Sequence, residues 1–336
     1  TAFTGTVLSG TVGGQLKIDW RDGLGVSGVL QGRKLDPAGI APDWKGLINF
    51  QLAGNLFKAK DAPLRGDVRG TLLESYLHGR ALTGDVRGAF AGDSIRIESL
   101  NLHGKGFHLR AAGELDKRLD LTAKIDDLTR LVPGASGALR AAGWVRLHRG
   151  RVSGDIKGQG RALTAENLQI AEADLAARFG PKKDDPLQAD AALRGIVYKH
   201  FRADVVKLEA RGTSRRHAIH AALRAPGAEA LLKLAGGYSD GWWRGKILRF
   251  SGKDTIGPWS LAAPANLAFG KGGMSLRTFV LNGMASERLE AAADIVRSGL
   301  RGTVSIYVAS LNMARLEPWL KGLRIAGAAG ADIRLD

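Results

Sequence analysis

Cysteine is absent from this sequence of 336 residues. Its absence excludes a disulfide framework, a thiolate zinc site and a cysteine nucleophile, and it is compatible with an oxidising compartment where free thiols are a liability. Proline is scarce, with 10 residues, whereas glycine is abundant, with 46. So much glycine indicates many tight turns or close approaches between backbone segments.

Long apolar runs are also missing, since none approaches the roughly 20 residues that a membrane-spanning helix requires. No signal peptide is recognisable at the amino end, where residues 1–6 already have a strand-like pattern. Both ends of the sequence read as cuts through a longer polypeptide, so we expect any anchor or export signal to lie outside it.

Aromatic residues are few, at 6%, and acidic residues are outnumbered, with 33 Asp and Glu against 49 Lys and Arg. A net charge of +16 is compatible with nucleic acid or an anionic membrane as partner. However, no run of five basic residues occurs, the densest basic spot is 215–217, and the aromatics are too few for a base-stacking platform. We therefore predict no nucleic-acid partner and a solvated outer face rich in arginine.

The sequence does contain a clear alternation of apolar and polar residues with a period of two. Each alternating run has one apolar and one mostly polar face, which is typical of a half-buried strand. Turn signals at 91–93, 235–241 and 270–273 separate such runs. The apolar positions of the clearest runs include Leu119, Leu121, Ile125, Leu139, Val145, Leu147, Leu187, Leu193, Leu289, Ile295, Val304 and Ile306.

Helical signals are sparse. Residues 126–132 could form one turn capped by Asp126 or Asp127 and ended by a Pro-Gly pair, and residues 310–320 look similar. We predict an all-β chain of about 22–26 strands with less than about 10% helix.

Loose internal repetition favours a solenoid-like array. The pentapeptide Gly-Asp-Val-Arg-Gly at 66–70 recurs at 84–88, and a module of strand, leucine-rich turn and strand at 119–147 begins again at 303–335. We see no domain boundary and predict one continuous repetitive segment over residues 1–336, with an exposed loop near 179–186.

No residues point to catalysis or metal binding. His217 and His220 are three apart, so on a strand they lie on opposite faces and cannot share a metal, and we expect ordinary polar-face or turn histidines. The acidic pairs 126–127 and 184–185 read as caps or solvated charges, because nothing nearby would separate two carboxyl pKa values. We predict no enzyme activity, no metal and no cofactor.

The apolar faces carry the informative signal, but alternation leaves their environment open. The same pattern suits the filled core of a sandwich or β-helix and an open groove lined by apolar side chains, because a side chain facing lipid and one facing a core look alike.

The order of several motifs resembles the repeating unit of the TamB family, in the AsmA-like group. Residues 100–115 read Leu-Asn-Leu-His-Gly-Lys-Gly-Phe-His-Leu-Arg-Ala-Ala-Gly-Glu-Leu, and residues 119–134 read Leu-Asp-Leu-Thr-Ala-Lys-Ile-Asp-Asp-Leu-Thr-Arg-Leu-Val-Pro-Gly. Gly-Ala-Leu-Arg-Ala-Ala-Gly-Trp-Val at 137–145, Ala-Glu-Asn-Leu-Gln-Ile at 165–170 and Ala-Asp-Leu-Ala-Ala-Arg-Phe at 173–179 follow. A strand with Trp-Trp-Arg-Gly at 242–245, then Gly-Pro-Trp-Ser-Leu at 257–261 and Ala-Asn-Leu-Ala-Phe at 265–269, looks like the middle of such proteins.

The resemblance implies an elongated, open, taco-shaped β-structure (a β-taco or open β-solenoid) with a hydrophobic inner groove in the periplasm of a Gram-negative bacterium. Proteins of this family are anchored in the inner membrane, partner TamA, an outer-membrane barrel of the Omp85 type, and are associated with phospholipid transport and autotransporter assembly. The twelve apolar positions named above would then line the groove and contact acyl chains.

Two alternatives stay open beside lipid transport. Open β-edges could accept unfolded outer-membrane protein clients by strand addition, which would make the chain a protein-handling scaffold. A closed β-helix with a filled core would make it an adhesin or a structural spacer.

Overall fold

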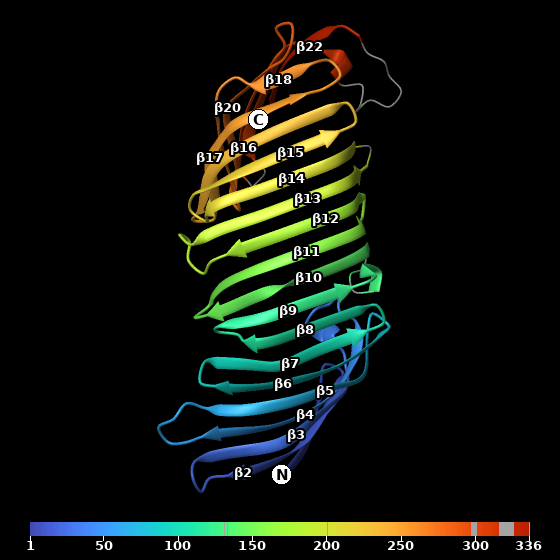
Figure 1. The fold of residues 1–336 in the computed structure, drawn as a ribbon, viewed down its shortest axis with the longest axis vertical. Coiled ribbons are helices and arrows are strands. Elements are labelled where there is room, and N and C mark those ends of the chain that lie inside the picture. Colours follow the sequence, from blue (N-terminus) through green and yellow to red (C-terminus); the bar gives the residue numbers. More distant parts are fainter. Residues whose placement is uncertain (131, 133, 200, 297–300, 316–325, 336) are drawn as a thin grey trace. The chain divides into compact units, whose positions relative to one another are not determined.

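The computed structural model describes residues 1–336 apart from 131, 133, 200, 297–300, 316–325 and 336. It divides into two compact units, Thr1–Glu166 and Asn167–Asp336. In both units most of the described backbone is strand, and tight turns, loops of a few residues and short 3-10 turns connect the strands (Figure 1). The prediction of an all-β chain with very little helix is therefore confirmed.

The first unit contains eleven strands and two short 3-10 helices in its described part. They are β1 (Ala2–Val7), β2 (Gly10–Asp19), β3 (Leu24–Leu35), η1 (Pro37–Gly39), β4 (Gly46–Lys58), β5 (Arg65–Leu77), β6 (Arg80–Ala91), β7 (Ser94–Gly104), β8 (Phe107–Glu114), β9 (Arg118–Ile125), η2 (Leu128–Arg130), β10 (Ala135–His148) and β11 (Arg151–Ala165).

Each strand of this unit pairs antiparallel with the next strand in the chain, so the sheet is a simple meander. Several connections are two-residue turns. His78 and Gly79 have φ of 49° and 71°, and Arg149 and Gly150 have 48° and 71°. Positive φ at both central residues is the signature of type I′ turns, whose twist matches that of the flanking strands, and glycine accepts this φ without strain.

The second unit has the same meander with one interruption. Its strands are β12 (Leu168–Phe179), β13 (Pro186–Tyr198), β14 (Phe201–Thr213), β15 (His217–Ala225), β16 (Ala228–Ser239), β17 (Trp242–Lys253), β18 (Pro258–Leu261), β19 (Ala265–Gly270), β20 (Gly273–Asn282), β21 (Arg288–Val296), β22 (Arg301–Asn312) and β23 (Ala328–Leu335). β18 and β19 act as one broken strand, because both pair with β17 on one side and with β20 on the other.

Local signals explain the short turns. The η2 helix begins where Asp127 caps it by accepting a hydrogen bond from the backbone N–H of Thr129, at 3.1 Å, as predicted for 126–132. The 310–320 prediction is wrong at its start, since β22 continues to Asn312, and the described residues 313–315 form a 3-10 turn. Residues 316–320 lie outside the described residues. The η1 helix, capped by Asp36, was not predicted.

Neither unit has a conventional core. In the described part of the chain only nine apolar side chains are buried, whereas many large apolar side chains are substantially exposed. The principal packing partners of every strand are its neighbours in the sheet. Each unit is thus a single sheet layer whose side chains are half-covered by one another, and the described residues of neither unit form the filled core of a closed β-helix.

Candidate functional site

The six predicted residues of the first unit share one face of its sheet. The register places Ile125 opposite Leu139 and Leu119 opposite Val145, so β9 and β10 present them to the same side. Leu119 is 7% exposed and Leu147 is 40% exposed, and the other four are half-buried. Every described register position of this face on β8–β11 is occupied by an apolar residue or glycine. We call this the apolar face of the first unit and the other side its polar face.

The six predicted residues of the second unit also share a face, and all are half-buried. A single row of paired residues across the sheet connects the predicted residues on β13 with those on β22. It runs Leu187, Gly212, His217, Gly236, Gly245, Leu267, Leu276, Ala293 and Val304. We call this side the apolar face of the second unit; His217 is the one polar residue in that row.

Glycines on both apolar faces make room for the large side chains of neighbouring strands. A Cβ built on Gly66 would lie 2.9 Å from Cε1 of Phe90, and one on Gly32 would lie 2.7 Å from Cδ1 of Leu35 and would collide with the ring of Phe50. Large side chains therefore lie flat over glycines of adjacent strands. The high glycine content accounts for a smooth, densely tiled apolar surface as well as for turns.

An aromatic cluster on the apolar face of the second unit was missed from sequence. Trp243 is 4% exposed, stacks on Phe269 at 5.2 Å between ring centroids, and lies over two glycines, with 2.6 Å from a Cβ at Gly236 to its Cζ2. Phe250 makes an edge contact with Trp259 at 4.9 Å. The available signal was the alternation of Trp243, Gly245 and Ile247 along β17.

The sequence predicts a polar-face or turn histidine at His217, and the structure places it directly after the turn 214–216. It lies at the margin of the apolar face and not on the polar face, because β15 begins with it and the following alternation is apolar. Trp243 Nε1 donates to its Nε2 at 2.8 Å, and its Nδ1 lies 3.0 Å from the carbonyl of Thr213. Its polar atoms are therefore satisfied. His220 lies on the other face, opposite Glu209 and Lys233, so the two histidines are separated as predicted.

The polar faces carry cross-strand pairs of charged and amide groups. The repeated pentapeptide places Asp67 on β5 and Asp85 on β6, and each accepts a hydrogen bond from an asparagine of the outer neighbouring strand, Asn55 and Asn101, both at 3.2 Å. Hydrogen bonds from Lys117 and Arg96 lower the pKa of the carboxyl of Glu114. Exposed pairs of this kind order the outer surface and add little stability.

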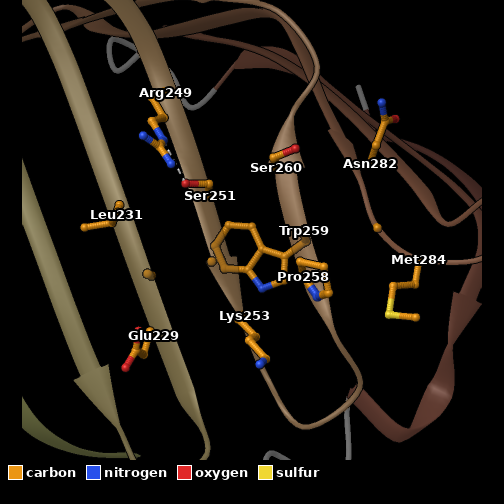
Figure 2. A pocket seen from close by; sticks show the side chains of 13 residues that line it. Glu229, Leu231, Arg249, Ser251, Lys253, Pro258, Trp259, Ser260, Asn282 and Met284 are labelled. Carbon is orange, nitrogen blue, oxygen red and sulfur yellow. Dashed lines mark hydrogen bonds between the residues drawn. The ribbon is translucent and has the colours of Figure 1, made fainter.

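A hollow of about 500 Å³ on the second unit is lined by residues of β16, β17 and β18 and by residues 282–284 at the end of β20 (Figure 2). Leu231, Trp259 and Met284 contribute its apolar part, and Glu229, Arg249 and Lys253 its charged part. The lining holds no nucleophile paired with a base and no pair of acidic groups. It therefore offers no constellation for catalysis.

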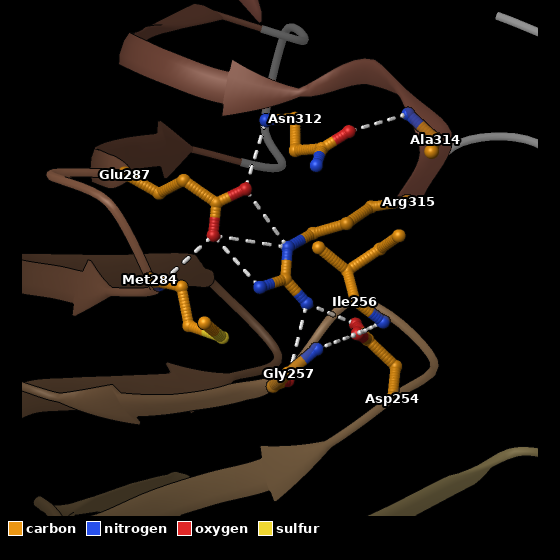
Figure 3. Close-up of polar contacts among 8 residues, drawn as sticks. All are labelled: Asp254, Ile256, Gly257, Met284, Glu287, Asn312, Ala314 and Arg315. Carbon is orange, nitrogen blue, oxygen red and sulfur yellow. Dashed lines mark hydrogen bonds and ion pairs between the residues drawn. The ribbon is translucent and has the colours of Figure 1, made fainter. Parts of the chain in front are cut away.

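A buried ionic clamp joins three connections along one edge of the second unit (Figure 3). Arg315, 11% exposed, donates to both carboxylate oxygens of Glu287, which is 6% exposed, at 3.0 and 2.7 Å, and pairs with Asp254. Glu287 also accepts from the backbone N–H of Asn312 at 2.8 Å and of Met284 at 3.0 Å. Bonding to Arg315 lowers the pKa of Glu287, which stays ionised.

The acidic pairs behave as caps and ion-pair partners. Asp126 pairs with Lys124 at 3.2 Å, and Asp185 accepts from the backbone N–H of Lys182 at 2.8 Å. Within the described residues, no group of three or more His, Asp and Glu side chains could hold a metal ion. In the same part of the chain no helix has the length and apolar character needed to cross a membrane.

The sequence matches a known family over its whole length. The family model described as the N-terminal domain of TamB covers residues 1–336. Residues 242–269, whose motifs look like the middle of such proteins, thus lie within the match to the model of the N-terminal domain. No solved structure matches the chain.

Proposed function

Because the chain belongs to the TamB family, a component of the translocation and assembly module, we propose that its apolar faces carry phospholipid acyl chains between the inner and outer membranes. The observation that supports this best is the uncharged apolar face of each unit, which no other part of the described chain covers with a second layer. A face that no second layer covers and that glycines keep smooth suits mobile hydrocarbon chains better than it suits one fixed ligand.

The energetics favour such a surface. A phospholipid has roughly 30 chain carbons, and at about 0.8 kcal/mol for each CH₂ its full exposure to water costs on the order of 25 kcal/mol. Half-buried Leu, Ile, Val and Phe side chains replace that water with a medium similar to the bilayer interior. The head group stays hydrated, so no charged group has to be buried.

We also propose the cellular setting that follows from the family. The family acts in the cell envelope together with TamA, and it is a transport and assembly component not known as an enzyme family. For the protein that contains this chain we propose a periplasmic location, an anchor in the inner membrane, a TamA-like outer-membrane barrel as partner, and no catalytic activity.

Photo-crosslinking tests the site directly. A benzophenone amino acid at Leu147, on the apolar face, should crosslink to phospholipid in the full-length protein, and one at the next residue, His148, on the polar face, should not. Lipid adducts at both positions, or at neither, contradict the proposal. Adducts of unfolded outer-membrane protein at Leu147 would favour the scaffold alternative.

A charge on the path tests transport. Leu121→Glu places a carboxylate on the apolar face of β9, whereas Thr122→Glu places it on the polar face opposite Arg110. Lipid delivery to the outer membrane should fail with Leu121→Glu and persist with Thr122→Glu. Equal delivery by both variants would show that acyl chains do not travel along this face.

A further inference from the structure

Two polar segments that stand out in the sequence meet at one edge of the second unit. The loop between β12 and β13 contains Lys182, Lys183, Asp184 and Asp185, and the turn between β14 and β15 contains residues 214–216. The backbone N–H of Arg215 donates to the carbonyl of Lys183 at 3.3 Å, and the Arg215 guanidinium pairs with Asp184 at 3.5 Å. We call these two segments together the basic edge.

The turn at the basic edge is held firmly by its neighbours. The backbone N–H of Thr213 donates to the carbonyl of Arg216 at 2.8 Å, and that of Tyr238 donates to the carbonyl of Ser214 at 2.9 Å. The Arg215 backbone also lies so close to Gly237 that a Cβ there would collide with it. The basic side chains therefore project from a fixed backbone, which reduces the entropy lost on binding a ligand.

The charge balance of the basic edge is positive. Four cationic side chains face two carboxylates, and both carboxylates are engaged, Asp184 with Arg215 and Asp185 with the backbone N–H of Lys182. In the described part of the chain, the side chains of Lys182, Lys183 and Arg216 have no hydrogen-bond or ion-pair partner. Three cations thus remain available to an anion from outside.

The basic edge adjoins the aromatic cluster of the apolar face. His217 follows Arg216 directly and accepts the hydrogen bond from Trp243, whose ring stacks on Phe269. Phe269 is 46% exposed, so part of the cluster is uncovered. Aromatic rings next to a row of cations are the arrangement that proteins present to the boundary between lipid head groups and acyl chains.

We propose that the basic edge binds the phosphate of an anionic phospholipid whose acyl chains lie on the Trp243–Phe269 surface. This inference rests on the function proposed above and adds a head-group preference to it. Arginine and lysine suit phosphate oxygens, and the excess positive charge favours a lipid with net negative charge over a zwitterionic one. The head group stays in water at the edge of the sheet while the chains enter the apolar face.

The experiment is mass spectrometry of the phospholipids that co-purify with the full-length protein, compared with an extract of the same membranes. The test variant Lys183→Gln/Arg216→Gln removes two charges from the basic edge. The control Lys199→Gln/Lys253→Gln removes two exposed charges from the opposite edge of the same unit. All four side chains are exposed, so thermal unfolding should be unchanged in both variants.

We expect phosphatidylglycerol and cardiolipin to be enriched over phosphatidylethanolamine in the wild-type protein and the control. The test variant should lose at least about fivefold of that enrichment while total bound lipid stays the same. Enrichment that survives in the test variant, or is absent from a lipid-loaded wild type, overturns the basic edge and leaves acyl-chain binding intact. A wild-type protein that carries no phospholipid overturns both proposals.

Discussion

The apolar face of β8–β11 in the first unit and the apolar face of the second unit are built from different residues on the same meander of hairpins. On β8–β11 of the first unit the face consists of aliphatic residues, alanine and glycine, with Phe107 as its one aromatic ring. The second unit adds a stacked aromatic cluster, a hydrogen-bonded histidine and a buried ionic clamp. Alternation thus specifies where an apolar face lies, whereas directional contacts decide how rigid it is.

This difference assigns distinct properties to the two surfaces. Aliphatic side chains over glycine have no preferred partner geometry, so β8–β11 of the first unit offer an even surface along their strands. Stacked rings and a charge-assisted clamp have one best geometry, so the second unit holds its face and its edge in a fixed arrangement. We expect perturbations of the second unit to be felt more sharply.

The largest expected effect comes from breaking the clamp. Arg315→Met leaves Glu287 and Asp254 without their cation, and removing one partner of a buried pair typically costs about 3–5 kcal/mol of the free energy of unfolding. Hydrogen exchange should rise in residues 254–257 and 283–287. The matched change in the first unit is Arg96→Met, which breaks the exposed pair with Glu114 at 2.8 Å and should cost less than about 1 kcal/mol. Equal losses for both variants would remove the contrast between the units.

Overpacking the tiled face should come next. In Gly32→Ala the new methyl group collides with the Phe50 ring and Leu35, and forcing extra volume into a packed site costs about 1–3 kcal/mol. Gly5→Ala is the control. Gly5, on β1, lies on the same apolar face of the sheet as Gly32 and has open space around it. Its substitution should be neutral or slightly stabilising in denaturant unfolding. If Gly32→Ala were as harmless, the rings would not depend on glycine for their place.

A smaller effect is expected at the histidine margin. Trp243→Phe keeps a ring over Gly236 and Gly245 but removes the donor to His217, and a lost hydrogen bond of this kind costs about 1 kcal/mol. A double-mutant cycle with His217→Phe should show coupling of that size in thermal unfolding. Additive losses would mean that the hydrogen bond does not hold the cluster in place.

The smallest expected effect is on acid stability. The pKa of Glu287 is lowered by Arg315, so its contribution is fully present above the carboxyl's ordinary pKa of 4.5 and is lost as pH falls through the lowered folded-state pKa. Protection from hydrogen exchange at 283–287, corrected for the slower intrinsic exchange in acid, should therefore fall as pH falls through the lowered pKa of Glu287. Glu287→Gln should make exchange there faster at neutral pH and less dependent on acid. An unchanged acid profile in Glu287→Gln would contradict the assignment.

Much of the fold followed from local sequence signals. Alternation identified the strands and placed Leu119, Val145 and Val304 on their apolar faces, because the period of a strand is set by covalent geometry. The helical turn capped by Asp127 was predictable because capping is a contact between residues close in sequence. The two copies of Gly-Asp-Val-Arg-Gly proved to be adjacent strands with equivalent asparagine partners.

The ionic clamp and the aromatic cluster depend on contacts between residues far apart in sequence, which local patterns do not predict. Arg315 pairs with Asp254, which lies 61 residues earlier in the chain, and the Trp243 ring packs over glycines on two strands. The place of His217 beside the apolar face was not predicted, because its sequence neighbours Arg216 and Ala218 give no sign of its contact with Trp243. Whether an alternating face is covered is likewise a property of the whole assembly of strands, which alternation cannot report.

The nearest-neighbour pairing of strands has a further consequence for how the chain acquires its structure. Within each unit every described pairing joins strands that are next to each other or one apart in the sequence. Low contact order of this kind removes the slow search for distant partners that limits most β-proteins. Each strand can pair as soon as the preceding strand is in place. Folding can therefore advance from the amino end one strand at a time. A mispaired strand would disturb only the strands beside it, because strands farther along the sheet do not pair with it.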